Sequence, residues 1–367
     1  MRSVAEIGTI ENKEKEIEEA TSKRNLYVGV DMHGKSWSIA VVDEYGTILA
    51  RTTMAPRSEA LIGYLSRYSS CDLQVCYEAG GFGYWLYDDL TTAGIAVSVI
   101  APSKVYKKPG EKVKTDRRDS ALLANQLAKG FLTGICVPDK VRRAHRQMMR
   151  LYDQVKKDKQ RVMIRIKAFL RLYGVEKPVE VSKSWSQSFV RWLKSFEFAG
   201  DVDGCLSYAR DEYVLEYEYL RERERAIKAK LSEIGKLPAY RARMEAVCAR
   251  KGVGEPTALR LLLEIGNCSR FRNSRKFTSF LGLTPRESSS GEKVHRGSIT
   301  GCGNFALRAS LVEIAWGVIK YDDSLHHTFV MLLRRRGKMR AIVAIARKLA
   351  VRIYWELREV ELLEEAE

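Results

Sequence analysis

Two aspartates three residues apart could together hold a metal ion. Asp116 and Asp119 lie in the run Lys114-Thr115-Asp116-Arg117-Arg118-Asp119, at the start of a segment, residues 116–130, that predicts a helix. Residues i and i+3 of a helix lie on one face, and two carboxylates that close repel each other unless a cation lies between them. Helix capping is the alternative, because unpaired N–H groups and the helix dipole also favour Asp at an N-terminus.

Two further acids favour the metal interpretation. Asp31 closes the apolar run 26–30 and Glu78 closes the run 73–77, and both runs have the length of a strand. Oxygen ligands with no His or Cys among them suit Mg²⁺ or Mn²⁺. We therefore expect four acids to converge on one magnesium ion, with manganese as a substitute: Asp31, Glu78, Asp116 and Asp119.

The elements that must position these acids predict an α/β unit. Short apolar runs separated by turns indicate strands, and the first three would form a meander. Strands that alternate with helices imply a mixed or parallel sheet covered by helices. The expected strands are 26–31, 36–43, 47–54, 73–79 and 95–100, with helices from Ser58 and from Tyr84 to Thr92.

These motifs resemble a known family, the DEDD transposases, and within it the insertion-sequence 110 family with its bridge-RNA-guided recombinases and Piv-type invertases. The resemblance implies an N-terminal RuvC-like domain of RNase H type, and it runs from about residue 26 to 355. The first signature is Tyr27-Val28-Gly29-Val30-Asp31, Tyr77-Glu78-Ala79-Gly80 and Lys114-Thr115-Asp116-x-x-Asp119. The second is Gly282-Leu283-Thr284-Pro285-Arg286, Ser290-Gly291, Gly297-Ser298-Ile299-Thr300 and Gly303-Asn304.

The resemblance also implies a nucleophile. Ser290, directly before Gly291, matches the family's nucleophilic serine, and Ser289 is the alternative because a run of serines permits a slip of one residue. Composition alone predicts that this run is a flexible, exposed loop. One position departs from the family: Gly301 follows Ile-Thr where the family usually has Lys, so a phosphate contact could be missing unless Lys293 or Arg296 supplies it.

The predicted organisation has four parts: a charged tail (1–25), the RuvC-like DEDD catalytic domain (26–137), a helical coiled-coil region (138–240) and a mainly helical C-terminal transposase domain (241–367). In the third part, a basic helix over 139–174 precedes a helix over 206–234 with an apolar residue every seventh position. These helices could pack on each other within one chain or join protomers into a dimer or tetramer. In the last part, glycines in 252–259 suggest a helix-hairpin-helix-like element whose N–H groups could bind phosphate.

The net charge and the cysteines of the chain indicate which binding partners and which cellular compartment to expect. The chain has 63 Lys and Arg against 46 Asp and Glu, a formal net charge of +17 that favours a polyanionic partner. Seven cysteines without a CxxC pair argue against a zinc ribbon and suit free thiols in a reducing cytosol. No run approaches 18 apolar residues, so we expect a cytoplasmic protein without a membrane partner. Three basic segments are candidate nucleic-acid contacts: 104–114, 140–171 and 334–340.

The resemblance implies a transposase that cleaves and rejoins donor and target DNA through a phosphoserine, with Mg²⁺ at the four acids and a structured bridge RNA as guide. Two alternatives stay open. A hydrolytic RuvC-like nuclease, such as a junction resolvase, would use water in place of Ser290. A non-catalytic nucleic-acid-binding protein would use its acids only for capping and neutralisation. Metal dependence separates the last from both enzymes, and a trapped protein–DNA adduct separates the first two.

Overall fold

The computed structural model describes residues 24–106, 116–181, 185–290 and 293–366, with only the backbone described at 116–117, 288–290 and 293–296. The chain forms two compact units, Met1–Val137 and Pro138–Glu367. The predicted charged tail and most of the basic loop 104–114 lie outside the described residues. In the described part of the chain, no helix is long and apolar enough to cross a membrane.

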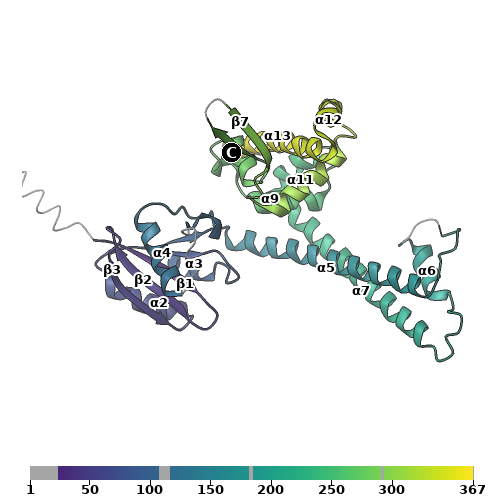
Figure 1. Ribbon diagram of the computed structural model, residues 1–367, viewed down its shortest axis with the longest axis horizontal. Helices are drawn as coiled ribbons and strands as arrows, with labels where there is room; N and C mark the ends of the chain where they lie inside the picture. The colour runs from purple at the N-terminus through teal and green to yellow at the C-terminus, as the bar shows by residue number, and fades with distance from the viewer. Residues whose placement is uncertain (1–23, 107–115, 182–184, 291–292, 367) are drawn as a thin grey trace, which may run out of the picture. The chain divides into compact units, whose positions relative to one another are not determined.

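The first unit is built on a mixed five-stranded sheet (Figure 1). β1 (Asn25–Met32), β2 (Trp37–Asp43) and β3 (Ile48–Met54) form the predicted antiparallel meander. β4 (Asp72–Glu78) pairs in parallel with β1, and β5 (Ala96–Ile100) pairs in parallel with β4. The strand order is therefore β3-β2-β1-β4-β5, and the α/β class expected from the sequence is confirmed.

Helices cover both faces of this sheet. Each face has its own core, because successive side chains of a strand point to opposite faces. Val28 and Val30 of β1 belong to the core under α2 (Ser58–Leu65) and α3 (Trp85–Thr92). Cys76 of β4 belongs to a separate core under α4 (Asp116–Ala128). The sheet therefore has an α2/α3 face and an α4 face.

A long helical hairpin begins the second unit. α5 (Lys140–Leu172) lies beside α7 (Cys205–Gly235), and α6 (Gln187–Ser195) lies at the end where the two helices are connected (Figure 1). The heptad residues of α7 are mostly buried against α5 in the same chain. The shared core contains Val155, Val162 and Ile166 of α5 and Tyr217, Leu220, Ile227 and Leu231 of α7.

This packing favours the single-chain interpretation of the coiled-coil seam. The apolar side chains that could have joined two protomers are covered within one chain. A homo-oligomer stays a prediction, and it would have to use other surfaces than this seam.

Most of the remaining helices pack against α13 (Lys338–Ala366), whose buried face includes Ile342, Ile345, Leu349 and Ile353. Side-chain caps define where two of them begin: Asn304 accepts a hydrogen bond from the Leu307 N–H, and Asp322 accepts one from the Leu325 N–H. The helices that contact α13 are α8 (Pro238–Cys248), α10 (Ser274–Phe280), α11 (Phe305–Val318) and α12 (Asp323–Arg336), and α9 (Glu255–Ile265) packs against α8 and α11. The mainly helical character predicted for this region is confirmed.

The prediction of a flexible loop around the serine run is wrong. β6 (Pro285–Ser290) and β7 (Lys293–Ile299) form an antiparallel hairpin in which Ser290 pairs with Lys293. Serine has weak intrinsic preference for strands, but strand formation depends on pairing and context more than on propensity. Here the partner strand supplies the backbone hydrogen bonds, and Ser290 is the last residue of β6.

Candidate catalytic site

Two of the predicted acids lie side by side at one edge of the sheet. β1 and β4 are parallel, with Val30 opposite Tyr77, so the next positions along the two strands are Asp31 and Glu78. Neighbouring strands lie about 4.8 Å apart. Val30 and Tyr77 both face the α2/α3 core, so alternation directs Asp31 and Glu78 to the opposite, α4 face.

Helix α4 approaches this face closely because Gly29 has no side chain. A Cβ at Gly29 would lie 2.1 Å from the Ser120 carbonyl oxygen and 2.6 Å from the Ala124 nitrogen. The backbone of α4 therefore lies directly on β1, two residues before Asp31. The glycine between Val28 and Val30 is required by this contact, since any Cβ would push the helix away.

The direction of α4 brings its N-terminus to the acidic edge. Further along the helix, Asn125 lies against Gly46, where a Cβ would be 2.4 Å from Asn125 Oδ1. Gly46 follows β2, whose Asp43 pairs with Leu26 at the start of β1. Since α4 thus runs toward the amino end of β1, its first turn, with Asp116 and Asp119, lies toward the carboxyl end that carries Asp31.

The arrangement fits an oxygen-ligated metal in its chemistry. Asp31, Glu78 and Asp119 come from β1, β4 and α4, and Asp116 begins α4, although only its backbone is described. Among the described side chains, no three His, Cys, Asp or Glu groups are close enough to hold a metal ion. The side chains of Asp31, Glu78 and Asp119 are therefore not gathered closely enough to hold a metal ion by themselves, although the elements that carry them meet at this edge, and a metal there stays a proposal.

A histidine that the sequence analysis did not single out, His33, contacts the first acid. His33 Nε2 lies 3.1 Å from Asp31 Oδ2, and an ionised carboxylate can only accept, so the imidazole donates. The turn is closed by the His33 N–H, which donates to the Ser36 carbonyl. The spacing of two residues along an extended chain was the available signal, because it places both side chains on one face.

The thiol beneath the acidic edge is not a candidate ligand or nucleophile. Cys76 is fully buried, two residues before Glu78. Burial, with a smaller contribution from the negative charge of Glu78, raises the pKa of Cys76 to about 12. Because the thiolate is the reactive and ligating form, Cys76 stays a protonated core residue at neutral pH.

A polar hollow lies beside Asp31 on the α4 face. Ser38 pairs directly with Asp31 across β1 and β2, and Thr53 pairs with Ser38 across β2 and β3. Together with the exposed guanidinium of Arg51 and with Ser120 of α4, they line a hollow of about 290 Å³. Hydroxyl groups and a cation next to carboxylates form a surface on which a phosphodiester could lie.

The serine signature belongs to the second unit, and its glycines fix the base of the β6–β7 hairpin. A Cβ at Gly303 would lie 2.6 Å from the Phe280 carbonyl oxygen, and one at Gly282 would lie 2.2 Å from the Cys302 carbonyl oxygen. Thr300 N–H donates to the Thr284 carbonyl at 3.0 Å, which closes the hairpin. Asn304 donates from Nδ2 to Glu264 Oε2 at 3.1 Å. These contacts hold the strand that ends at Ser290.

The side chains that decide the finer serine predictions lie outside the described residues. This holds for Ser289 and Ser290 themselves, and also for Lys293 and Arg296, the possible substitutes for the missing family lysine. The choice between Ser289 and Ser290 therefore stays a prediction from the sequence.

A packing contact explains the first glycine of the predicted helix-hairpin-helix-like element. A Cβ at Gly252 would lie 2.9 Å from the backbone carbon of Gly317 in α11, so this glycine serves internal packing. At the start of α9, Glu255 places a carboxylate where a phosphate would lie, and Ser232 Oγ donates to it at 3.0 Å. The structure thus gives no support for phosphate binding at this helix start.

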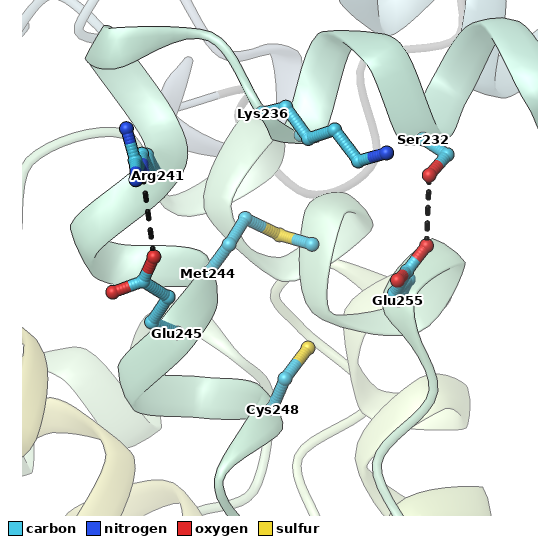
Figure 2. A pocket seen from close by; sticks show the side chains of 8 residues that line it. Ser232, Lys236, Arg241, Met244, Glu245, Cys248 and Glu255 are labelled. Carbon is cyan, nitrogen blue, oxygen red and sulfur yellow. Dashed lines mark hydrogen bonds and ion pairs between the residues drawn. The ribbon is translucent and has the colours of Figure 1, made fainter.

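The neighbouring pocket has mixed charge. Figure 2 shows Ser232 with Glu255 on one side and Arg241 with Glu245 on the other, and Met244 and Cys248 between them. Burial, together with the charge of Glu255, raises the pKa of the Cys248 thiol. The two carboxylates offset the charges of Lys236 and Arg241, so this pocket is a poor site for a polyanion.

The basic helix α5 uses part of its charge inside the protein. Arg146 pairs with Glu264 of α9, and Lys159 pairs with Glu224 of α7. Ion pairs between described residues also involve three other cations of α5: Arg142, Arg161 and Arg165. The cations left exposed to solvent include Lys140, Arg150, Lys157, Lys167 and Arg171.

Comparison with known proteins matches both ends of the chain to one family. A model of the IS110-type DEDD transposases matches residues 28–175, which contain the four acids. A model described as transposase of the IS116/IS110/IS902 family matches residues 244–330, which contain Ser290. The chain belongs to the IS110 family of DEDD transposases. The protein is therefore a transposase, an enzyme that acts on DNA.

Two relatives named as transposases align over 92% and 66% of the chain, and a gene-inverting protein aligns over a third of it. The transposase for insertion sequence element IS1533 of Leptospira borgpetersenii is 26% identical over 92% of this chain and 97% of its own length. A Sinorhizobium fredii protein that is named as a transposase is 32% identical over 66% of this chain. The aligned part covers 57% of the length of that relative. A pilin gene-inverting protein of Moraxella bovis is 31% identical over 33% of this chain and 39% of its own length.

Proposed function

We propose that this transposase cuts and rejoins DNA strands through a phosphoserine on Ser290, with a divalent cation held by Asp31, Glu78, Asp116 and Asp119 in an RNase H-type, RuvC-like unit. One observation carries the proposal. Asp31 and Glu78 end adjacent parallel strands on the α4 face, and the contact of α4 with Gly29 directs the helix start with Asp116 and Asp119 to that same edge.

The chemistry of the four acids suits Mg²⁺. All four would offer carboxylate oxygens, the donors that Mg²⁺ and Mn²⁺ prefer. When bound, such an ion polarises phosphoryl oxygens and lowers the pKa of a nearby hydroxyl. His33 would hold the Asp31 carboxylate in one orientation through its 3.1 Å hydrogen bond.

The protein's own residues would perform the exchange in two balanced steps. In the first, the Ser290 hydroxyl attacks phosphorus, an Oγ–P bond forms, one P–O bond to a sugar breaks, and the serine proton passes to the leaving sugar oxygen. In the second, a sugar hydroxyl of another strand attacks the phosphorus, a new P–O bond to that sugar forms, the Oγ–P bond breaks, and the hydroxyl proton passes to Oγ, which restores the serine. The phosphodiester energy is kept in the Oγ–P bond, so no external energy source is required.

The two parts of the site belong to different units, so catalysis would require them to meet at one phosphodiester, within a chain or between protomers of a homo-oligomer. Arg51, Ser38 and Thr53 beside Asp31 are suited to contact the DNA backbone. The exposed cations of α5 are candidates for the phosphates of donor DNA, target DNA or a bridge RNA. The proposal of guidance by such an RNA rests on family membership.

Metal dependence tests the acidic site. Asp31→Asn and Glu78→Gln should each abolish strand cleavage in Mg²⁺ while most DNA affinity is retained, because the amide cannot replace a charged ligand. Asp72→Asn is the matched control, since Asp72 is exposed at the opposite end of the same strand as Glu78. Cleavage in EDTA at the rate seen in Mg²⁺ would contradict a metal site. A variant that cleaves normally would remove its residue from the proposal.

A further inference from the structure

A groove in the second unit has not yet been given a role. It has a volume of about 540 Å³ and lies between the base of the β6–β7 hairpin and the helices α12 and α13. Volumes of this size are typical of sites that hold small ligands or single groups of larger ones. Its hairpin side is formed by Leu283, Pro285, Gly297, Ser298 and Ile299.

The helical side of the groove repeats a basic and apolar pattern. Arg340, Val343, Ala344 and Arg347 follow one another at spacings of three, one and three along α13, which places all four on one face of the helix. Two small apolar residues are therefore flanked by one guanidinium a turn before them and one a turn after. Arg336, at the end of α12, adds a third guanidinium.

The charge of the groove has one sign. No acidic residue lines it among the residues that the structure describes. This contrasts with α5 and with the pocket of Figure 2, where Glu or Asp neutralises many of the cations. Three guanidinium groups around an apolar floor match a chain that carries regularly spaced negative charge and flat apolar groups, and this combination is found in a nucleic-acid strand.

We propose that this groove binds the DNA strand on which Ser290 acts, with phosphates on Arg336, Arg340 and Arg347 and one sugar or base against Leu283, Ile299 and Val343. The inference rests on the proposed function for the choice of DNA, because the hairpin that forms one wall of the groove is the hairpin that ends at Ser290. The residues of the groove thereby position the strand and take no part in the bond changes.

The groove and Ser290 are close enough along the hairpin for a single DNA strand to contact both. Pro285 lies in the groove wall, and Ser290 lies five residues further along β6. At about 3.3 Å per residue this is roughly 16 Å. Successive phosphates of one DNA strand lie about 3.4 Å apart along the helix axis, so the groove would hold a nucleotide about five positions from the phosphodiester that Ser290 attacks.

Two variants separate the electrostatic and the steric parts of the proposal. Arg340→Ala combined with Arg347→Ala removes the flanking charges. Ala344→Phe keeps every charge but fills the floor of the groove. The matched control is Arg272→Ala combined with Arg275→Ala, which removes the same charge from exposed positions of the second unit that lie outside the groove and outside the basic segments.

The measurement is binding of the full chain to a mixed-sequence DNA duplex, and to RNA of the same sequence, over a series of salt concentrations. The Arg340→Ala/Arg347→Ala variant should reduce the slope of log affinity against log salt on duplex DNA by about 1.8, which corresponds to two lost phosphate contacts. Ala344→Phe should weaken DNA binding about tenfold, as expected when the site of one base is blocked. The control should keep the wild-type slope and affinity.

Several outcomes would overturn the proposal. Wild-type binding and slope in the Arg340→Ala/Arg347→Ala variant would remove the groove from the DNA-binding surface. The same loss in the Arg272→Ala/Arg275→Ala control would show that only the total charge of the protein matters. A loss confined to RNA would assign the groove to RNA and contradict the choice of DNA. Unchanged melting temperatures check that each variant is folded, and Ala344→Phe can fail this check without affecting the arginine test.

These binding measurements do not depend on strand cleavage. A groove variant that binds normally contradicts the groove alone. A wild-type protein that binds DNA through the groove but never forms a covalent adduct contradicts the phosphoserine mechanism alone.

Discussion

Substitution of Gly29 by alanine tests the placement of α4 on the sheet, on which the acidic site depends. The new Cβ would lie 2.1 Å from the Ser120 carbonyl oxygen, against about 3.4 Å for an ordinary contact, so α4 must retreat by about 1.3 Å. The nearest atoms belong to the backbone of a helix, and no flexible side chain can move out of the way.

The expected effects are large and separable. Overpacking of this kind costs about 1–3 kcal/mol, and a shift of about 1 Å in the position of catalytic groups can reduce a rate about 100-fold. Gly29→Ala should therefore lower the melting temperature of the first unit by several degrees, about 4 °C or more. Strand cleavage should fall at least about 100-fold, while DNA affinity changes little.

The assay combines thermal unfolding with Mg²⁺-dependent cleavage of labelled DNA. Gly63→Ala on α2 is the matched control: an added Cβ there meets no atom within 4 Å, and alanine is favoured over glycine within a helix. The control should melt at the same or a higher temperature and cleave normally. A Gly29→Ala protein with wild-type melting temperature and cleavage would refute the close contact between α4 and β1.

Three further predictions concern other parts of the molecule. Arg51→Ala should weaken duplex binding and lower its salt slope by about 0.9, for one lost phosphate contact, with Arg57→Ala unchanged; salt-dependent fluorescence anisotropy measures both. Burial acts to raise the pKa of Asp322, but hydrogen bonds from the Leu325 N–H and Arg352 outweigh it and lower that pKa. Asp322→Ala should destabilise by about 1 kcal/mol at pH 7; in chemical unfolding this difference should begin to shrink as the pH falls below the ordinary aspartate value of about 4 and should disappear below the lower pKa of the native carboxyl. Cys76, whose pKa is raised to about 12 by burial, should resist alkylation in the native protein at pH 8 while the exposed Cys136 reacts, as mass spectrometry of the labelled peptides would reveal.

The first unit was largely predictable because local patterns and global packing agree there. Apolar runs of strand length ended in Asp31 and Glu78, and parallel pairing of those two strands is enough to place the acids at one edge. The start of α4 at Asp116 was likewise visible from its acids and the apolar residues after them.

What the sequence did not reveal depends on contacts between distant segments. The need for glycine at residue 29 arises only from α4, which begins 87 residues later in the chain. In the same way, the neutralisation of Arg146 depends on Glu264, and the strand that ends at Ser290 depends on its pairing with β7. Neither contact leaves a periodic signal near the residue that it affects.

The seven-residue apolar repeat of α7 shows a second limit of prediction from sequence. Its spacing predicted an apolar seam correctly, but periodicity does not specify the partner. The partner is α5 of the same chain, whose own apolar residues complete the core. A seam of this kind is therefore evidence for a helix pair and gives no evidence for an oligomer by itself.

The most direct test of the proposed mechanism is to trap and map the covalent protein–DNA adduct. Wild-type protein is incubated with substrate DNA and Mg²⁺, denatured, digested, and analysed by mass spectrometry for the modified residue. We predict a nucleotide attached to Ser290, no adduct in Ser290→Ala, and an adduct retained in Ser288→Ala and Ser289→Ala. A modification on Ser289 would move the nucleophile by one residue. Normal cleavage by Ser290→Ala, with no adduct in the wild type, would contradict the phosphoserine mechanism and favour hydrolysis by water.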